Sequence, residues 1–223
     1  MTRSDSGFTL IEIIIVTAII GVIAGVAVPN LITSRSIANE RAVISTLRTI
    51  STAQSQCWSQ RVVDTDSDGC GEALSLGELS GVVGLRNGAL KLTPPSLPGS
   101  LGTANATGQA TAKGYLIALY LPNAAGQGLL GTPANLASVS ADLAETAWTC
   151  VAWPLTHGNT GSATFFVNQA GEIVVSRLAT YSGTSSVPPA GAALVGVASN
   201  IIVGGDLACD AVGADGNLWN TLR

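Results

Sequence analysis

An acidic stretch at residues 64–72, DTDSDGCGE, has the spacing of a cation-binding loop. Carboxylates at alternate positions followed by glycine can present several hard oxygen ligands to one Ca²⁺. The twelfth position of an EF-hand loop falls on Ser75 instead of glutamate, so we expect a nearby glutamate to substitute. The alternative is a solvated acidic turn without a ligand. The candidate calcium ligands are Asp64, Asp66, Asp68 and Glu72, with Gly69 at the turn.

A second carboxylate, Glu12, lies near the start of an aliphatic run that extends from Phe8 to Val28. A bilayer core about 30 Å thick is spanned by roughly 20 such residues in a helix. An acid inside such a segment costs free energy, so it indicates a function and requires a partner. The alternative is that Glu12 lies close enough to the end of the segment to reach the membrane interface.

Four cysteines follow the apolar run, and no two of them have the C-x-x-C spacing of a zinc site. An even number of cysteines in an exported domain favours disulfides. Of the three pairings that four cysteines allow, we favour the two that close separate loops without crossing. They are Cys57–Cys70 and Cys150–Cys209.

The string Gly7-Phe8-Thr9-Leu10-Ile11-Glu12, with the apolar run and Pro29 after it, resembles the amino terminus of type IV pilins and pseudopilins. The leader is too short, and the apolar run too long, for an ordinary secretory signal. In the family, a membrane peptidase cuts after the glycine and methylates the new amino terminus. The resemblance therefore implies cleavage between Gly7 and Phe8, followed by N-methylation of Phe8.

The resemblance also implies a role for Glu12 and Pro29 in assembly. In the family, the glutamate neutralises the amino terminus of a neighbouring subunit when the helices pack in a filament. Glu12 lies about one helical turn from the new amine at Phe8. A matched pair is tolerated in a low-dielectric bundle where a single charge is costly. Phe8, Glu12 and Pro29 are therefore the expected assembly residues.

The expected fold is α+β, with a long amino-terminal helix kinked near Pro29 and packed on an antiparallel sheet, as in type IV pilins. Proline in a helix removes one hydrogen bond, so we expect a kink or loosening over residues 21–29. Beyond Pro29, an apolar stripe through Ile44, Leu47 and Ile50 predicts an amphipathic helix that reaches about residue 62. The expected divisions are a leader (1–7), a membrane and filament-core helix (8–30) and a globular domain (31–223). Within that domain we expect a helix (31–62), a loop region (63–112), and a sheet with the carboxyl-terminal region (113–223).

Short segments within the globular domain carry further signals. A short helix is predicted near Leu74–Leu79, and a three-residue connection at 169–171 predicts a hairpin. The predicted strands are Tyr115–Leu121, Ala147–Trp153, Ala163–Asn168 and Glu172–Leu178, with shorter ones at Val195–Ser199 and Asn200–Val203.

The charge composition limits the classes of function that the chain could have. The net charge is −4 and no basic stripe occurs, so no nucleic-acid binding is indicated. We expect a structural subunit and not an enzyme: a major pilin held in the inner membrane, processed by prepilin peptidase, and assembled by the pilus machinery into an extracellular homo-oligomeric filament. The alternatives are a pseudopilin of a type II secretion system, forming a periplasmic pseudopilus, and a membrane-tethered binding domain. No cofactor other than Ca²⁺ is expected.

Overall fold

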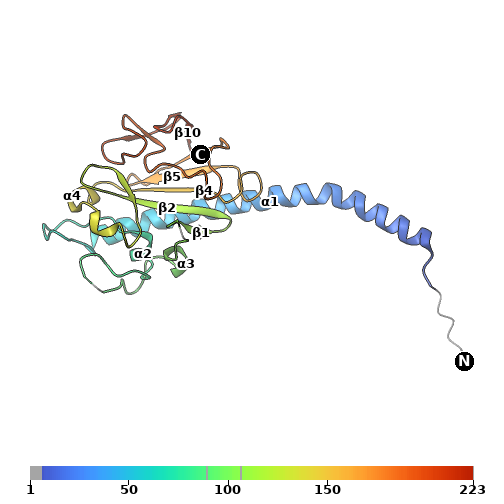
Figure 1. The fold of residues 1–223 in the computed structure, drawn as a ribbon, viewed down its shortest axis with the longest axis horizontal. Coiled ribbons are helices and arrows are strands. Elements are labelled where there is room, and N and C mark those ends of the chain that lie inside the picture. Colours follow the sequence, from blue (N-terminus) through green and yellow to red (C-terminus); the bar gives the residue numbers. More distant parts are fainter. Residues whose placement is uncertain (1–6, 89, 106, 223) are drawn as a thin grey trace, which may run out of the picture.

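One helix, α1, organises the whole molecule. In the computed structural model, which describes residues 7–88, 90–105 and 107–222, α1 runs from Leu10 to Ser59 and is 50 residues long. At 1.5 Å per residue it extends about 75 Å. Its second half lies within the globular part of the chain, while its first half projects away from it (Figure 1). The predicted long helix is confirmed, and its end falls three residues before the predicted residue 62.

The projecting half of α1 passes through Pro29 without a break. Proline removes one backbone donor, so the carbonyl of Gly25, four residues earlier, loses its helical partner. One turn later, the hydroxyl of Thr33 donates a hydrogen bond to the Pro29 carbonyl at 3.1 Å. The helix is therefore continuous where the sequence predicted a kink or loosening. Figure 1 shows a bend spread along this half.

An antiparallel sheet packs against the second half of α1. Its strand order is β1-β2-β4-β5-β6-β10-β9, and β3 pairs with β2 beside this path. The four central predicted strands are confirmed to within two residues at each end, and the 169–171 connection joins β5 to β6. The bounds are β1 (Ala110–Ala112), β2 (Tyr115–Pro122), β3 (Gly128–Leu130), β4 (Thr149–Pro154), β5 (Thr164–Asn168), β6 (Ile173–Ser176), β9 (Ala211–Val212) and β10 (Leu218–Thr221).

Both faces of the sheet are buried. Successive side chains on a strand point to opposite faces, and on β4 Cys150 and Ala152 join the core against α1. Val151 and Trp153 join a second core on the other face, together with Trp219. All eight residues of β2 are consequently buried, which explains why its sequence is apolar throughout and does not alternate.

The carboxyl-terminal region covers the face away from α1. A small sheet pairs β7 (Leu194–Val195) with β8 (Asp206–Leu207). The strands predicted at Val195–Ser199 and Asn200–Val203 are therefore wrong. Gly196, with φ at 82°, turns the chain inside the first predicted strand, and residues 199–200 form a turn where the second was predicted to begin.

The segment between α1 and the sheet is mostly loop, as predicted, and wraps the end of α1. It contains α2 (Leu76–Leu79), which confirms the predicted short helix, and α3 (Gly99–Gly102). Its last residues form β1, which the sequence had assigned to loop. Further along the chain, a 3₁₀ turn (Leu136–Ser138) and α4 (Ala141–Ala144) connect β3 to β4.

A buried amide fastens this loop to α1. Gln54 is 2% exposed, and its Nε2 donates to the Leu74 carbonyl at 2.6 Å. Its Oε1 accepts from the Leu74 backbone N–H at 2.9 Å. Because Leu74 is completely buried, no solvent can replace these two bonds. Gln54 thus takes the place of a backbone partner for a segment that has no strand beside it.

Replacing Gln54 with alanine should lower the free energy of unfolding by about 2–4 kcal/mol, because two buried backbone groups lose their partners. Urea unfolding of a fragment comprising residues 34–223 measures this, since every described residue before Ser36 is exposed. The matched control is Ser55→Ala, an exposed neighbour that bonds only its own helix and should change stability by less than about 0.5 kcal/mol. Equal effects of the two substitutions would contradict the role assigned to Gln54.

Candidate functional site

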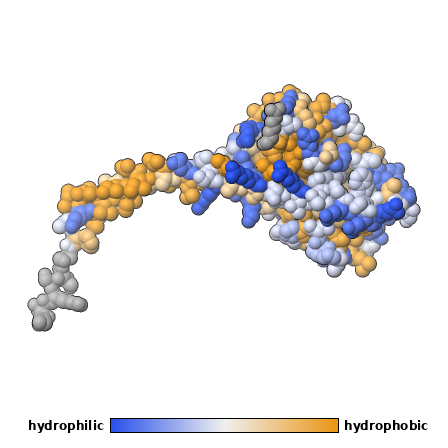
Figure 2. Space-filling view, turned by 180° about the vertical axis from the view of Figure 1, so that it is seen from behind, coloured by the Kyte–Doolittle hydropathy of each residue, from blue (hydrophilic) through white to orange (hydrophobic). Residues whose placement is uncertain are grey.

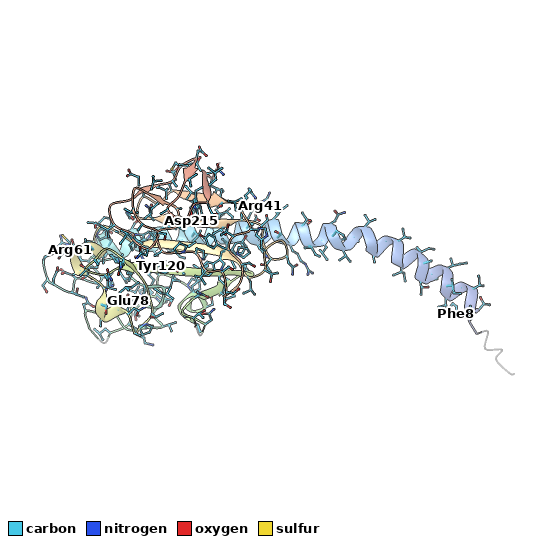
Figure 3. All side chains as sticks on the ribbon, turned by 45° about the horizontal axis from the view of Figure 1, so that its top comes forward. Phe8, Arg41, Arg61, Glu78, Tyr120 and Asp215 are labelled. Atoms are coloured by element: carbon cyan, nitrogen blue, oxygen red, sulfur yellow. The ribbon has the colours of Figure 1, made fainter. Side chains whose placement is uncertain are left out.

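The predicted cleavage point is open to an enzyme. Gly7 and Phe8 precede α1 in non-helical backbone, and Phe8 is 84% exposed. A Cβ added to Gly7 would meet no atom of the described residues within 4 Å, apart from its chain neighbours, so these residues leave the scissile bond uncrowded. Figure 3 shows Phe8 at the far end of α1 from the globular part. The rest of the predicted leader, residues 1–6, lies outside the described residues.

Glu12 forms a capping box with Thr9 at the start of α1. Its Oε2 accepts from the Thr9 backbone N–H at 2.8 Å and from the Thr9 hydroxyl at 2.7 Å. The Thr9 hydroxyl in turn accepts from the Glu12 N–H at 3.3 Å. These bonds satisfy donors that every helix start leaves free. The T-x-x-E spacing of Thr9 and Glu12 is the sequence signal for this capping role, which the predicted membrane and assembly roles of Glu12 did not include.

The projecting half of α1 exposes a continuous apolar surface. Every described residue from Gly7 to Arg35 is exposed, and large side chains such as Ile20, Val22 and Val26 are more than half exposed. Figure 2 shows this surface as an orange rod beyond the globular part. Among the described residues, α1 is the helix whose length and composition suit a membrane span.

The acidic loop brings together the three predicted aspartates. Oxygens of Asp64, Asp66 and Asp68 lie within 4.8 Å of one another. Each carboxylate accepts a backbone N–H inside the loop, the closest from Cys70 to Asp68 at 2.7 Å. Oδ1 of Asp64 is buried and has no hydrogen-bond partner among the described residues. Oxygen donors of this kind fit Ca²⁺.

Two further acids lie beside these aspartates. Asp142 belongs to α4, and Glu145 follows the last residue of that helix. Oxygens of Asp66, Asp142 and Glu145 lie within 4.8 Å of one another, and Asp68, Cys70 and Glu145 form another such set. Neither acid was predicted as a ligand, because no local spacing relates Asp142 or Glu145 to aspartates more than 70 residues earlier. We call Asp64, Asp66, Asp68, Asp142 and Glu145 the acidic cluster.

Glu72 does not belong to the acidic cluster, contrary to its predicted role as a calcium ligand. It is 1% exposed, and its Oε2 lies 3.5 Å from Nε of Arg86. Its Oε1 accepts from the backbone and hydroxyl of Thr65, both at 2.5 Å. A buried carboxylate needs this pairing. Glu72 therefore anchors the base of the acidic loop by pairing with Arg86.

The two predicted disulfides are absent from the structure, in which all four cysteines are free. Cys150 points into the core against α1, whereas Cys209 is exposed and follows Ala208 of the core on the opposite face of the sheet. Their sulfurs cannot meet with the sheet between them, because bonded cysteines need Cβ atoms about 4 Å apart. Burial raises the pKa of the Cys150 thiol, which keeps it protonated.

The Cys57–Cys70 pairing fails for a similar reason. Sγ of Cys57 lies in the core 3.6 Å from Oγ of Ser96. Cys70 is exposed in the acidic loop, where Asp68 and Glu145 raise the pKa of its thiol. The backbone returns to the end of α1 after this loop, since a Cβ at Gly71 would contact the Trp58 carbonyl oxygen, but the two cysteine side chains lie in different environments.

Comparison with known proteins supports the resemblance of the amino-terminal segment to that of type IV pilins. The family model described as the prokaryotic N-terminal methylation motif matches residues 2–28. The type IV major pilin protein PilA of Myxococcus xanthus is 39% identical over 57 residues, which are 26% of this chain and 26% of that protein. The type IV wide pilus major component PilA4 of Thermus thermophilus is 49% identical over 45 residues, which are 20% of this chain and 34% of that protein.

These matches show that the amino-terminal segment of this chain is similar to that of type IV major pilins and carries the methylation motif. The helix-and-sheet architecture is consistent with the type IV pilin fold. The matched parts span only about a quarter to a third of the two relatives' own length. No solved structure matches the chain.

Repulsion within the acidic cluster should make stability depend on pH. Burial and then Asp68, Asp66 and Asp142 raise the pKa of Glu145, and burial and Asp68 raise that of Asp66. The folded chain thus holds these protons to higher pH than the unfolded chain. The two acids therefore weaken folding as the pH rises above the ordinary carboxyl range near 4. Glu145→Gln should raise the melting temperature at pH 7 in chelator, and this gain should vanish at about pH 4.

Glu172→Gln is the matched control for this pH dependence, because Glu172 is exposed at the β5–β6 turn outside the acidic cluster. It should shift melting little at either pH. A gain for Glu145→Gln that is the same at pH 4 and pH 7 would contradict the electrostatic explanation.

Calcium binding at the acidic cluster stays a prediction, with a direct thermal test. A ligand that binds only the folded chain raises its stability by mass action. At ten times its dissociation constant, Ca²⁺ would raise the melting temperature of the fragment 34–223 over that in chelator by about 3–6 °C. Asp66→Ala should abolish this difference, and Asp206→Ala, an exposed aspartate of β8, should leave it intact. Identical melting of the unmodified fragment in both conditions would reduce the segment to an acidic turn.

Proposed function

We propose that this chain is the structural subunit, and specifically the major pilin, of a type IV pilus. One observation carries the proposal: a methylation segment opens a helix whose apolar half is exposed at every described residue from Gly7 to Arg35. Such a surface must be covered, first by lipid and later by the same segment of other copies. Both relatives are named as major components of type IV pili, which supports the pilus assignment.

The proposed sequence of events follows from the exposed start of α1. Prepilin peptidase cuts between Gly7 and Phe8 while residues 8–30 cross the inner membrane once. Phe8 is then N-methylated, and the pilus machinery transfers the helix from lipid into a homo-oligomeric filament outside the cell. A continuous helix suits both environments, because its backbone hydrogen bonds are satisfied internally.

Glu12 has two parts in this proposal. In the chain as described it caps its own helix through Thr9, which reduces the cost of placing a carboxylate in an apolar segment. Cleavage then creates a cationic amine at Phe8. In the filament, the Glu12 carboxylate would pair with the amine of a neighbouring copy, which fixes the axial position of one helix against the next.

A pseudopilin of a type II secretion system is the second candidate, because the methylation motif identifies the processing segment and not the final assembly. We favour the pilus because both relatives carry that name. We infer no catalytic role. The sequence holds a single histidine and no G-x-S-x-G motif, so the usual nucleophile arrangements have little support.

Two substitutions of Glu12 separate its capping role from its charge. Glu12→Gln keeps an acceptor for Thr9 but removes the charge, whereas Glu12→Ala removes both. If charge pairing directs assembly, both variants should be cleaved normally and yield at least tenfold fewer filaments than the unmodified chain. The measurement is electron microscopy of sheared filaments, with mass spectrometry for a subunit beginning at methylated Phe8.

Near-normal filament yield from Glu12→Gln alone would assign the residue to capping. Normal yield from both variants would remove Glu12 from assembly altogether. Long filaments built mainly of another protein would refute the major-pilin proposal.

A further inference from the structure

The charges on the globular part are separated along its length. Exposed arginines lie where α1 enters the globular part, and few acids lie beside them. Glu40 lies among these arginines, but it already pairs with Arg177 at 3.9 Å and accepts hydrogen bonds from Ser162. Figure 3 shows Arg41 at this end, where the projecting half of α1 begins. We call the exposed cations of this end, Arg35, Arg41, Arg48 and Arg177, the basic end.

The acidic cluster lies at the opposite end of the globular part. The acidic loop folds back beside Arg61, since a Cβ at Gly69 would lie 3.7 Å from Nη1 of Arg61. Figure 3 places Arg61 at the end farthest from Phe8, and Figure 1 places α4, which carries Asp142, at that same end. One arginine thus lies beside a cluster of five carboxylates, within which neighbouring acids raise the pKa values of Asp66 and Glu145.

The basic end contains a hollow that none of the described residues fills. It has a volume of about 320 Å³ and is lined by Arg41, Ile44, Ser45, Arg48 and Leu222, with no acid among them. Among the described residues, the ion pairs are those of Arg86 and Arg177, so no acid of this part of the chain pairs with Arg41 or Arg48. A carboxylate-rich loop would meet guanidinium donors in this hollow.

We propose that the acidic cluster of one copy docks into the hollow between Arg41 and Arg48 of a second copy. The inference rests on the proposed filament, in which copies lie parallel. Parallel copies at the same height would place like charges side by side. A shift along α1 of at least about 20 Å, the rise from Ser45 to Ser59, brings opposite charges together. One contact, repeated along the filament, then places both ends of a copy against groups of opposite charge.

A second copy explains the charges better than a lipid surface does. Anionic headgroups would also attract Arg41 and Arg48, but they would leave the acidic cluster uncompensated and closer to a negative surface. Docking between copies uses the two unpaired charge groups together. The contact is heterologous, so it propagates as a helical array instead of closing into a dimer.

A native thiol permits a direct test. Cys70 is exposed within the acidic loop, whereas Cys57 and Cys150 are buried and out of reach. In full-length chains carrying Cys209→Ser, Arg48→Cys should form disulfides with Cys70 of the next copy when sheared filaments are oxidised mildly. Non-reducing electrophoresis should show a ladder of covalent multimers. Adding Cys70→Ser should abolish the ladder.

The matched control is Val195→Cys in the same background, an exposed position on β7 outside both charge groups. It should give no ladder dependent on Cys70. Filaments in which Arg48→Cys and Val195→Cys behave alike would overturn the docking contact and leave the filament proposal intact. Absence of filaments from the unmodified chain would overturn the filament proposal, and the contact with it.

A charge exchange distinguishes the lipid alternative. Arg41→Glu with Arg48→Glu should reduce filament yield at least tenfold, and adding Asp66→Arg with Asp68→Arg should restore it. If lipid headgroups are the true partner, the four-residue variant will assemble no better than the arginine variant, which would also overturn the docking contact.

Discussion

The structure depends on a helix that continues for 50 residues although only its second half has a core to pack on. The packed half is stabilised by the sheet, through side chains such as Val43, Leu47 and Ile50 that are fully buried. The other half has no such support from its own chain. Apolar surface left in water costs about 25 cal/mol per Å², so this half is stable only where lipid or other helices cover it. The apolar half of α1 therefore depends on lipid or on neighbouring copies for its stability.

The polar side chains in the apolar half of α1 must also find hydrogen-bond partners without water. The hydroxyl of Thr17 bonds to carbonyls one turn earlier, at 2.9 and 3.0 Å, and Glu12 bonds to Thr9. Each group therefore carries its own partner into an apolar environment. Glu12 is an ionisable group, however, and this distinguishes it from Thr17. The local hydrogen bonds reduce the free-energy cost of placing this segment in lipid. The carboxyl group of Glu12 allows the segment to pair with an opposite charge on a neighbouring copy.

Local patterns in the sequence predicted most of the fold. The long helix, the four central strands and the β5–β6 hairpin follow from periodicity and turn residues, which act over a few positions. The two- to four-residue strands β9 and β10 carried no such pattern, and they form because β6 provides an edge for pairing. The disulfide prediction failed because it used only loop length, whereas the alternation along β4 turns Cys150 toward α1 and away from Cys209. The aspartates of the acidic loop were predicted by spacing, but Asp142 and Glu145 join them through tertiary contacts that no spacing reveals.

The acidic cluster connects the two proposals made for the globular part. Its carboxylates repel one another, so any cation that fits among them stabilises that end of the molecule. Ca²⁺ and the arginines of a second copy both satisfy this requirement, and they compete for the same oxygens. By linkage, a calcium ion that occupies the cluster must weaken docking by the same factor by which docking weakens calcium binding. The separation of charge along the globular part would then orient neighbouring copies. The concentration of Ca²⁺ around them would also set the strength of the contact between copies.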